Sequence, residues 1–172
     1  MRCSKSWVLL LATLPTGLIT GLFYGFAVAI NPALARLSDT KYIETMQAIN
    51  EVIQNPWFGL PFFGAPLLLI WAAWWHRHSA GSVAGPLWLA TLLYLVGNLG
   101  ITLGANVPLN QKLASFPIAH ASAEAAAAQR RHFARAWTGW HTARTGASLG
   151  AWGLLLVACL ADSAGHRGQT QL

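Results

Sequence analysis

The sequence predicts an all-α membrane protein, a four-helix transmembrane bundle that forms a single domain over residues 1–172. Only 9% of the residues are charged, whereas a soluble domain usually carries about 25%, and the mean hydropathy is +0.44. Four apolar runs are each long enough for a span of about 20 residues, the fourth if its helix begins near Trp137. We expect spans at about 7–30, 56–75, 83–107 and 137–161.

The first span, Trp7–Ile30, admits a second interpretation as a signal peptide. Basic residues precede it, and Ala27-Val28-Ala29 resembles a cleavage site. However, the run holds 24 residues, whereas the apolar core of a signal peptide holds roughly 7–15. Three further spans follow, so we expect a retained helix. Asn31-Pro32 should close it, because a residue before proline disfavours the helical conformation.

The segment between the first two spans is predicted to form a short amphipathic helix. Polar residues such as Lys41 and Glu44 occupy one side of this helix, and apolar residues form a stripe on the other. Such a helix lies along the membrane interface or over the bundle. The apolar stripe consists of Tyr42, Ile43, Met46, Ile49 and Ile53.

Proline and asparagine mark the limits of the second and third spans. Asn55 is a suitable N-cap for the second span, with Pro56 at the first helical position. Pro108 is predicted to end the third span. The stretch "ASAEAAAAQRRHFARAW" before the fourth span is rich in alanine, the strongest helix former. We expect this Ala-rich helix to lead directly into the fourth span.

The expected topology brings polar and aromatic residues together at one end of the bundle. The first and third helices end on the side opposite the termini, where the second and fourth begin. There, Trp137, Trp140, His141 and Arg144 follow the spacing i, i+3, i+4 and i+7, which is one face of a helix. Polar groups in hydrocarbon must find partners, so we expect them to face inward. The residues expected to join them are Tyr24, Asn31, Asn106 and Asn110.

Each of these residues also has a purely structural interpretation. Intramembrane asparagine commonly links helices by hydrogen bonds, tryptophan commonly belongs to an interfacial belt, and arginine commonly snorkels to the headgroups. The combination favours a pocket, because a belt needs no His141 and Arg144 on the same face. A polar pocket with aromatic walls and one fixed cation suits a small planar anionic or phenolic ligand.

Two other kinds of site are disfavoured. His76 and His78 lie on different faces of a helix, and no carboxylate or cysteine joins them, so we expect no metal. The net charge of +6 comes from scattered residues. Arg130, Arg131 and Arg135 flank a span, where basic residues meet anionic lipid. We therefore expect the lipid bilayer as a partner and no nucleic acid.

Four segments, "GLFYGFAVAINPALARL", "MQAINEVIQNPWF", "ANVPLNQKL" and "WTGWHTART", occur in this order. Their order and spacing resemble those of small integral membrane proteins grouped with the fungal anthrone oxygenases. The N-x-P-L-N element at Asn106–Asn110 and the W-x-x-W-H/N-x-x-R element at Trp137–Arg144 are the most specific. The resemblance extends from Gly21 to about Ala151. It implies a four-helix membrane bundle, and likeness to bacterial members implies the bacterial inner membrane.

The resemblance also implies an oxygenase without metal, flavin or other cofactor that oxidises anthrones to anthraquinones. His141 would be the base, since the unperturbed pKa of histidine, about 6.5, lies near working pH. Arg144 would hold the developing oxyanion. The remaining substrate contacts would come from Asn106, Asn110, Trp137 and Trp140.

Two other functions stay open at this stage. One is a non-catalytic membrane binder, such as a subunit or carrier for a quinone-like molecule. The other is a structural bundle that binds no small molecule. A closed polar pocket containing His141 and Arg144 would favour an enzyme or a binder over a structural protein.

Overall fold

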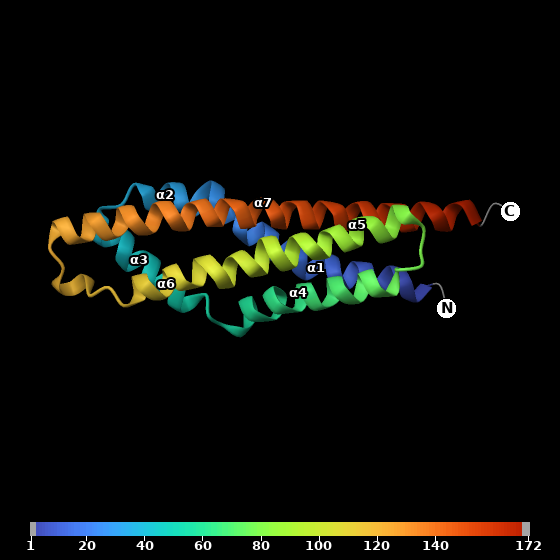
Figure 1. The fold of residues 1–172 in the computed structure, drawn as a ribbon, viewed down its shortest axis with the longest axis horizontal. Helices are drawn as coiled ribbons and strands as arrows, with labels where there is room; N and C mark the ends of the chain where they lie inside the picture. The colour runs from blue at the N-terminus through green and yellow to red at the C-terminus, as the bar shows by residue number, and fades with distance from the viewer. Residues whose placement is uncertain (1–2, 170–172) are drawn as a thin grey trace.

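The computed structural model describes residues 3–169, and helices form nearly all of this part (Figure 1). Within it, four helical segments are long and apolar enough to cross a membrane: Ser6–Ala35, Pro56–Trp75, Gly81–Ala114 and Ala123–Gly165. The predicted all-α, four-span bundle is therefore confirmed. The elements in chain order are α1 (Cys3–Gly25), η1 (Phe26–Ile30), α2 (Asn31–Ala35), α3 (Asp39–Val52), α4 (Pro56–Trp75), α5 (Gly81–Leu92), η2 (Leu93–Gly100), η3 (Thr102–Asn106), α6 (Val107–Ala114), η4 (Ile118–His120) and α7 (Ala123–Gln169).

The first and third spans continue beyond the prolines that were expected to end them. Asn31-Pro32 does not close the first helix, and Pro108 does not close the third, because α2 and α6 extend both. A π-helical segment precedes each proline. The residue before each proline donates its backbone N–H to the carbonyl five residues back, Phe26 or Thr102. This wider turn accommodates a proline ring that would clash with the carbonyl four residues before it.

The predicted amphipathic helix is α3, and it packs over the far end of the bundle, the end opposite the termini (Figure 1). Tyr42, Ile43 and Met46 are buried there in a cluster with Leu113 of α6 and Phe133 of α7. The apolar stripe of α3 thus faces the bundle. The Ala-rich helix also runs into the fourth span as predicted, and together they form α7, a single helix of 47 residues.

Arg130 of α7 fastens the turn between α2 and α3. Its guanidinium donates hydrogen bonds to the carbonyl oxygens of Ala35 at 2.9 Å and Leu37 at 2.7 Å, and to the Asp39 carboxylate at 2.9 Å. It also lies over the Tyr42 ring, 4.7 Å from its centre. A helix ends with carbonyl groups that lack intrahelical partners, and Arg130 satisfies such groups after α2.

The length of α4 indicates which part of the bundle lies in hydrocarbon. Its 20 residues, at about 1.5 Å each, match a hydrocarbon core about 30 Å thick. Trp57 and Trp74, near its two ends, are exposed, as is usual for tryptophans at the membrane interfaces. Because α7 is more than twice as long as α4, its first turns extend beyond the far end of α4, together with α2, α3 and α6 (Figure 1).

Two glycines allow the first and third spans to approach α7 closely. A Cβ atom at Gly97 would run into the Cβ of Ala147, and one at Gly17 would lie 2.9 Å from the indole nitrogen of Trp152. By contrast, a Cβ at Gly21 would meet nothing within 4 Å. Tight packing in this bundle therefore depends on particular glycines.

Candidate functional site

Arg144 of α7 is a buried cation that contacts the first and third spans. Only 8% of its surface is exposed. Its Nη1 donates to the Thr102 hydroxyl at 3.1 Å, and its Nε and Nη2 lie 3.2 and 3.1 Å from Nδ1 of His141. The guanidinium carbon also lies 4.2 Å from the centre of the Phe23 ring. Arg144 therefore points into the bundle and does not snorkel toward headgroups.

The depth of Arg144 in the membrane follows from the packing of Phe23. Phe23 shares a cluster with Phe58 and Phe62, which belong to the first two turns of α4. Because α4 begins at the far boundary of the hydrocarbon, Arg144 lies just inside that boundary. A guanidinium at this depth loses much of its hydration, and a nearby negative charge would interact with it strongly.

His141 is held between Arg144 and a backbone carbonyl. A guanidinium only donates hydrogen bonds, so Nδ1 of His141 must present its lone pair to Arg144. The proton is then assigned to Nε2, which donates to the carbonyl oxygen of Phe23 at 3.2 Å. This neutral tautomer avoids a second positive charge beside Arg144. Both ring nitrogens are therefore occupied in this structure.

Aromatic rings enclose the imidazole of His141. The Trp137 ring stacks on it, with centroids 4.8 Å apart and an interplanar angle of 11°. The rings of Phe23 and Phe26 meet it edge-on at 5.7 and 5.8 Å. These contacts fix the orientation of His141, which in turn helps to fix Arg144.

Two asparagines of the third span hold Trp137 in place. The indole N–H donates to Oδ1 of Asn110 at 2.7 Å, and the amide of Asn106 donates to the backbone carbonyl of Trp137 at 3.3 Å. The N-x-P-L-N element thus packs directly against the W-x-x-W-H element. The side-chain oxygen of Asn106 is buried and has no hydrogen-bond partner.

A cavity of about 600 Å³ adjoins this cluster, within the usual range of about 300–1,000 Å³ for small-molecule sites. Trp137, His141 and Arg144 line it on the α7 side. The second half of α3 covers it, and α1, η1, the start of α4 and α6 complete its walls. The cavity therefore extends from the membrane-embedded cation of Arg144 to the face of α3 that covers it.

Arg144 has no carboxylate partner within residues 3–169. Lys41 pairs with Glu44 and Arg130 with Asp39, and neither ion pair involves Arg144. Glu51 lines the cavity but is exposed on α3. A buried, unpaired cation is costly, and an anion that enters the cavity would offset that cost. The site is therefore suited to a planar ligand with a negatively charged oxygen.

Metal ligands are not grouped in the part of the chain that the structure describes. Within residues 3–169, no group of three or more histidine, cysteine, aspartate or glutamate side chains could hold a metal ion. The expectation that the protein works without a metal or another cofactor stays a prediction.

The family described as anthrone oxygenase matches residues 57–154, more than half of the 172 residues. The chain belongs to the anthrone oxygenase family. The matched region runs from the start of α4 into the second half of α7. It contains the cluster residues Thr102, Asn106, Asn110, Trp137, His141 and Arg144. No curated protein and no solved structure matches the chain.

In this anthrone oxygenase family member, the predicted site residues separate into two groups. Asn106, Asn110, Trp137, His141 and Arg144 lie together as expected. The others do not join them. Tyr24, at 53% exposure, and Trp140, at 48%, are exposed, Asn31 is half-buried, and none of the three lines the cavity. Asn106 does not line the cavity either, although it holds Trp137 from behind.

The position of Tyr24 has a local cause. Phe23 and Phe26, on either side of it, both face His141, and on a helix residues three apart share a face that the residue between them does not. Trp140 likewise lies on the flank of α7 beside the inward-facing Trp137 and His141.

Sequence analysis missed the contribution of α3 to the cavity. Gln47, Asn50 and Gln54 line it from above. Their spacing of i, i+3 and i+7 places them on one face of α3, which is the signal that could have revealed them. The amide nitrogen of Asn50 is buried and has no hydrogen-bond partner. These residues lie outside the family match, in the helix that covers the site.

Proposed function

We propose that this chain binds a planar, lipid-soluble aromatic substrate as its anion and oxidises it with O₂ without a metal or flavin, in the inner membrane of a bacterium. The observation that carries the proposal is Arg144, a buried cation without a carboxylate partner that lines an aromatic cavity. Membership of the anthrone oxygenase family supports an anthrone or a related phenol as the substrate class.

The reaction balances with O₂ as the only oxidant. Loss of a proton from the CH₂ group of an anthrone leaves an anion whose charge rests mainly on the former carbonyl oxygen, which is attached to the central ring. The anion transfers an electron to O₂, the two radicals join to form a peroxide anion, and this anion takes up a proton to give a hydroperoxide. Loss of the second C–H proton and cleavage of the O–O bond give the quinone carbonyl and hydroxide, which takes up a proton. One anthrone and one O₂ thus give one anthraquinone and one water.

Arg144 is proposed to stabilise the substrate oxyanion. A charge-assisted hydrogen bond in a site of low dielectric favours the ionised substrate and lowers the barrier to proton loss. Contacts to Thr102 and His141 use three of the five N–H donors of the guanidinium in the structure, and we propose that the substrate oxygen takes the place of His141. This exchange replaces a neutral acceptor with an anion and is therefore favourable.

His141 is proposed to become the base only after that exchange. Its Nδ1 lone pair is occupied by Arg144 in the structure. When Arg144 turns to the substrate oxyanion, Nδ1 becomes free to accept a proton, while Nε2 keeps its bond to the Phe23 carbonyl. Substrate binding would thus make Nδ1 available as the base. Without substrate, Nδ1 would stay bonded to Arg144 and would not be protonated.

The bilayer is proposed to deliver the substrate. Leu22 and Phe58, near the far boundary of the hydrocarbon, line the cavity, and Leu22 is exposed on the outside of the bundle. An apolar aromatic molecule concentrates in the bilayer because transfer from water is favourable. Its polar edge would then meet Arg144 while its rings lie against Trp137 and Phe26.

A second candidate function is a non-catalytic binder or carrier of a quinone-like molecule. The occupied nitrogens of His141 favour it, because neither ring nitrogen is free to take up a proton in the structure. In this alternative, Arg144 would donate to a quinone carbonyl and no proton would move.

Oxygen consumption separates the two functions. The purified protein in lipid nanodiscs is mixed with an anthrone, and O₂ uptake and anthraquinone absorbance are followed together. The proposal predicts equimolar O₂ uptake and product formation, with at least a tenfold loss of rate in Arg144→Gln and an unchanged rate in Arg36→Gln, a control on the exposed far surface. Binding of the anthrone without O₂ uptake would contradict catalysis and support the carrier.

A further inference from the structure

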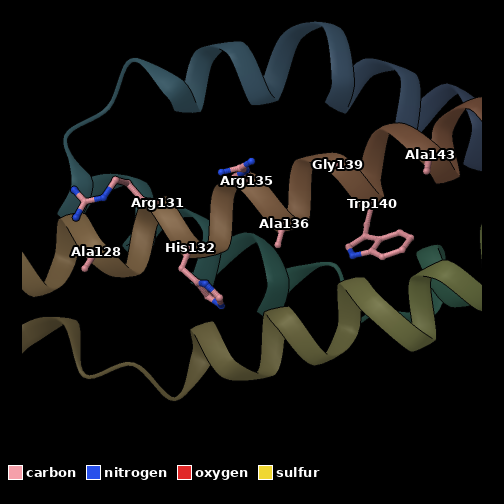
Figure 2. A pocket seen from close by; sticks show the side chains of 8 residues that line it. All are labelled: Ala128, Arg131, His132, Arg135, Ala136, Gly139, Trp140 and Ala143. Carbon is pink, nitrogen blue, oxygen red and sulfur yellow. The ribbon is translucent and has the colours of Figure 1, made fainter.

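The outer face of α7 carries a second, more open concavity of about 1060 Å³, lined by residues of α7 alone (Figure 2). Small residues form its floor, and longer side chains rise on both sides. In Figure 2, Arg135 extends to one side of the helix, whereas His132 and Trp140 extend to the other. We call this concavity the α7 groove; it is lined by Ala128, Arg131, His132, Arg135, Ala136, Gly139, Trp140 and Ala143.

The two arginines of the α7 groove are free cations. Arg131 and Arg135 are exposed, and within residues 3–169 neither forms an ion pair or a side-chain hydrogen bond. Their neighbour Arg130, by contrast, is fully engaged with the turn between α2 and α3. The acidic residue in the first turn of α7 is Glu124, about two turns from Arg131. The groove therefore presents uncompensated positive charge.

The position of the groove relative to the bilayer divides it into two halves. Trp140 is one turn nearer the far end than Arg144, which places its exposed ring at the boundary of the hydrocarbon. Arg135 and Arg131 follow at roughly 7 and 13 Å beyond Trp140, at about 1.5 Å per residue. The headgroup region is about 5–8 Å deep, and arginine side chains can reach back toward it. Both guanidinium groups can therefore meet lipid phosphates, while Ala143, on the hydrocarbon side of Trp140, faces acyl chains.

We propose that the α7 groove binds one anionic phospholipid. The phosphate lies at Arg131 and Arg135, the glycerol backbone lies over Ala136 and Gly139, and one acyl chain continues over Ala143. Trp140 forms the wall at the level of the glycerol backbone. The inference does not depend on the proposed function, because the groove lies on the outer face of α7 and the cavity with Arg144 on the inner face.

Two other occupants fit this surface less well. A nucleic acid would contact only the half of the groove with Arg131 and Arg135. It would leave Trp140 and the small residues on the hydrocarbon side without a partner. A second copy of the chain, related by two-fold symmetry, would place the same arginines against each other, and like charges at short distance repel. An anionic lipid is charged at the level of the arginines and apolar at the level of Ala143.

Native mass spectrometry of the detergent-solubilised protein measures this selectivity. The full chain is titrated with phosphatidylglycerol or with phosphatidylcholine of the same acyl chains. We expect one phosphatidylglycerol to bind in preference to phosphatidylcholine. Each basic residue near an anionic surface contributes about 1 kcal/mol, so the Arg131→Gln/Arg135→Gln variant should bind phosphatidylglycerol about 25-fold more weakly. A charge-matched control, Arg36→Gln/Lys112→Gln, removes two exposed cations of the far end outside the groove and should bind normally.

A second variant tests the groove floor. Gly139→Leu adds a side chain where a Cβ meets nothing within 4 Å, so the variant should fold, yet it should fill the groove and weaken lipid binding. Equal affinity for the two lipids, or an equal loss in both double variants, would overturn the proposal. So would a loss of dimers in place of bound lipid in the Arg131→Gln/Arg135→Gln spectra, because that result would assign the groove to a second copy.

Discussion

At the scale of single residues, the site depends on how Arg144 distributes its hydrogen-bond donors. The planar guanidinium reaches Thr102 on one side and His141 on the other, and it rests on the Phe23 ring. No single-point cation could make these contacts together. The same fork can present two donors to a ligand oxygen without moving the helix. Charge and shape therefore both matter at this position.

Arg144→Lys is expected to insert and fold but to bind planar phenols poorly. Lysine keeps the positive charge but loses the planar fork and the stacking on Phe23. Affinity for a hydroxyanthraquinone should fall at least tenfold, measured by quenching of tryptophan fluorescence. Arg36→Lys, on the exposed far surface, is the matched control and should bind as the wild type does. Normal affinity in Arg144→Lys would show that charge alone suffices.

Asn110 and Trp137 are expected to be energetically coupled. The indole N–H donates to Asn110 at 2.7 Å, and a buried donor left unpaired costs about 1–3 kcal/mol. Asn110→Ala should therefore destabilise the wild type more than it destabilises Trp137→Phe, which has no indole donor. The coupling free energy in this double-mutant cycle should be about 0.5–1.5 kcal/mol, measured by reversible unfolding. Additive effects would mean that the hydrogen bond contributes nothing.

At the scale of helices, the site is shaped by the π-helical segments before Pro32 and Pro108. η1 contributes Phe26 to the ring cluster around His141, and η3 contains Thr102 and Asn106. A single turn with one extra residue changes which side chains face inward beyond it. Because both spans continue as α2 and α6, their ends pack with α3, and α3 and α6 line the cavity. The prolines are thus compatible with long helices that reach out of the membrane.

The spans themselves were predictable from the sequence because hydrophobic length is a local property. The uncharged runs and the stripe of Tyr42 and Met46 were enough to place the four spans and α3. The π-helical turns were not predictable, because a residue before proline usually ends a helix. Only the structure shows that the N–H of this residue instead bonds to the carbonyl five residues back. Tyr24 was expected in the site because the sequence does not fix the rotation of the first helix about its axis. In the structure, Phe23 and Phe26 face His141, and this rotation leaves Tyr24 exposed.

The site was predictable where its residues share one helix face. Trp137, His141 and Arg144 follow from their spacing on α7. Their partners on other helices, such as Thr102 and Phe23, depend on the rotation of each helix about its axis, which a hydropathy pattern defines only broadly. The spacing of Gln47, Asn50 and Gln54 places them on one face of α3, but only the packing of α3 over the bundle shows that this face meets the cavity.

Gly97→Ala is expected to destabilise the contact between the third span and α7. The new Cβ would collide with the Cβ of Ala147, and neither atom can move without its backbone. Gly21→Ala is the matched control, because it adds a methyl group to open space and improves helix propensity by up to about 1 kcal/mol. Thermal unfolding in detergent should show a lower midpoint for Gly97→Ala and an equal or higher one for Gly21→Ala. The opposite order would contradict the packing of these helices.

At the scale of the whole molecule, the four spans place the start of α1 and the end of α7 on one side of the bilayer. The connection between α4 and α5, which contains Ser79, lies on that side, and α3, which contains Thr40, lies on the other (Figure 1). In a variant without native cysteines, single cysteines at Ser79 and Ser163 should react with an impermeant maleimide from the same side in sealed vesicles. A cysteine at Thr40 should react only from the opposite side. Labelling of Ser79 and Ser163 from different sides would disprove the four-span topology.

The whole arrangement gives one bundle with a cation buried at its boundary, rings around it and a cavity large enough for an aromatic ligand. This arrangement implies that Arg144 stabilises the anionic form of a bound ligand. The direct measurement uses a hydroxyanthraquinone that is neutral in solution at the working pH and changes colour when its phenol ionises. Bound to the wild type, it should show the phenolate spectrum, because Arg144 lowers the pKa of the bound phenol, and each unit corresponds to about 1.4 kcal/mol. Bound to Arg144→Gln, it should show the neutral spectrum. A neutral spectrum in the wild type, or the same spectrum in both proteins, would show that Arg144 does not stabilise the ligand anion.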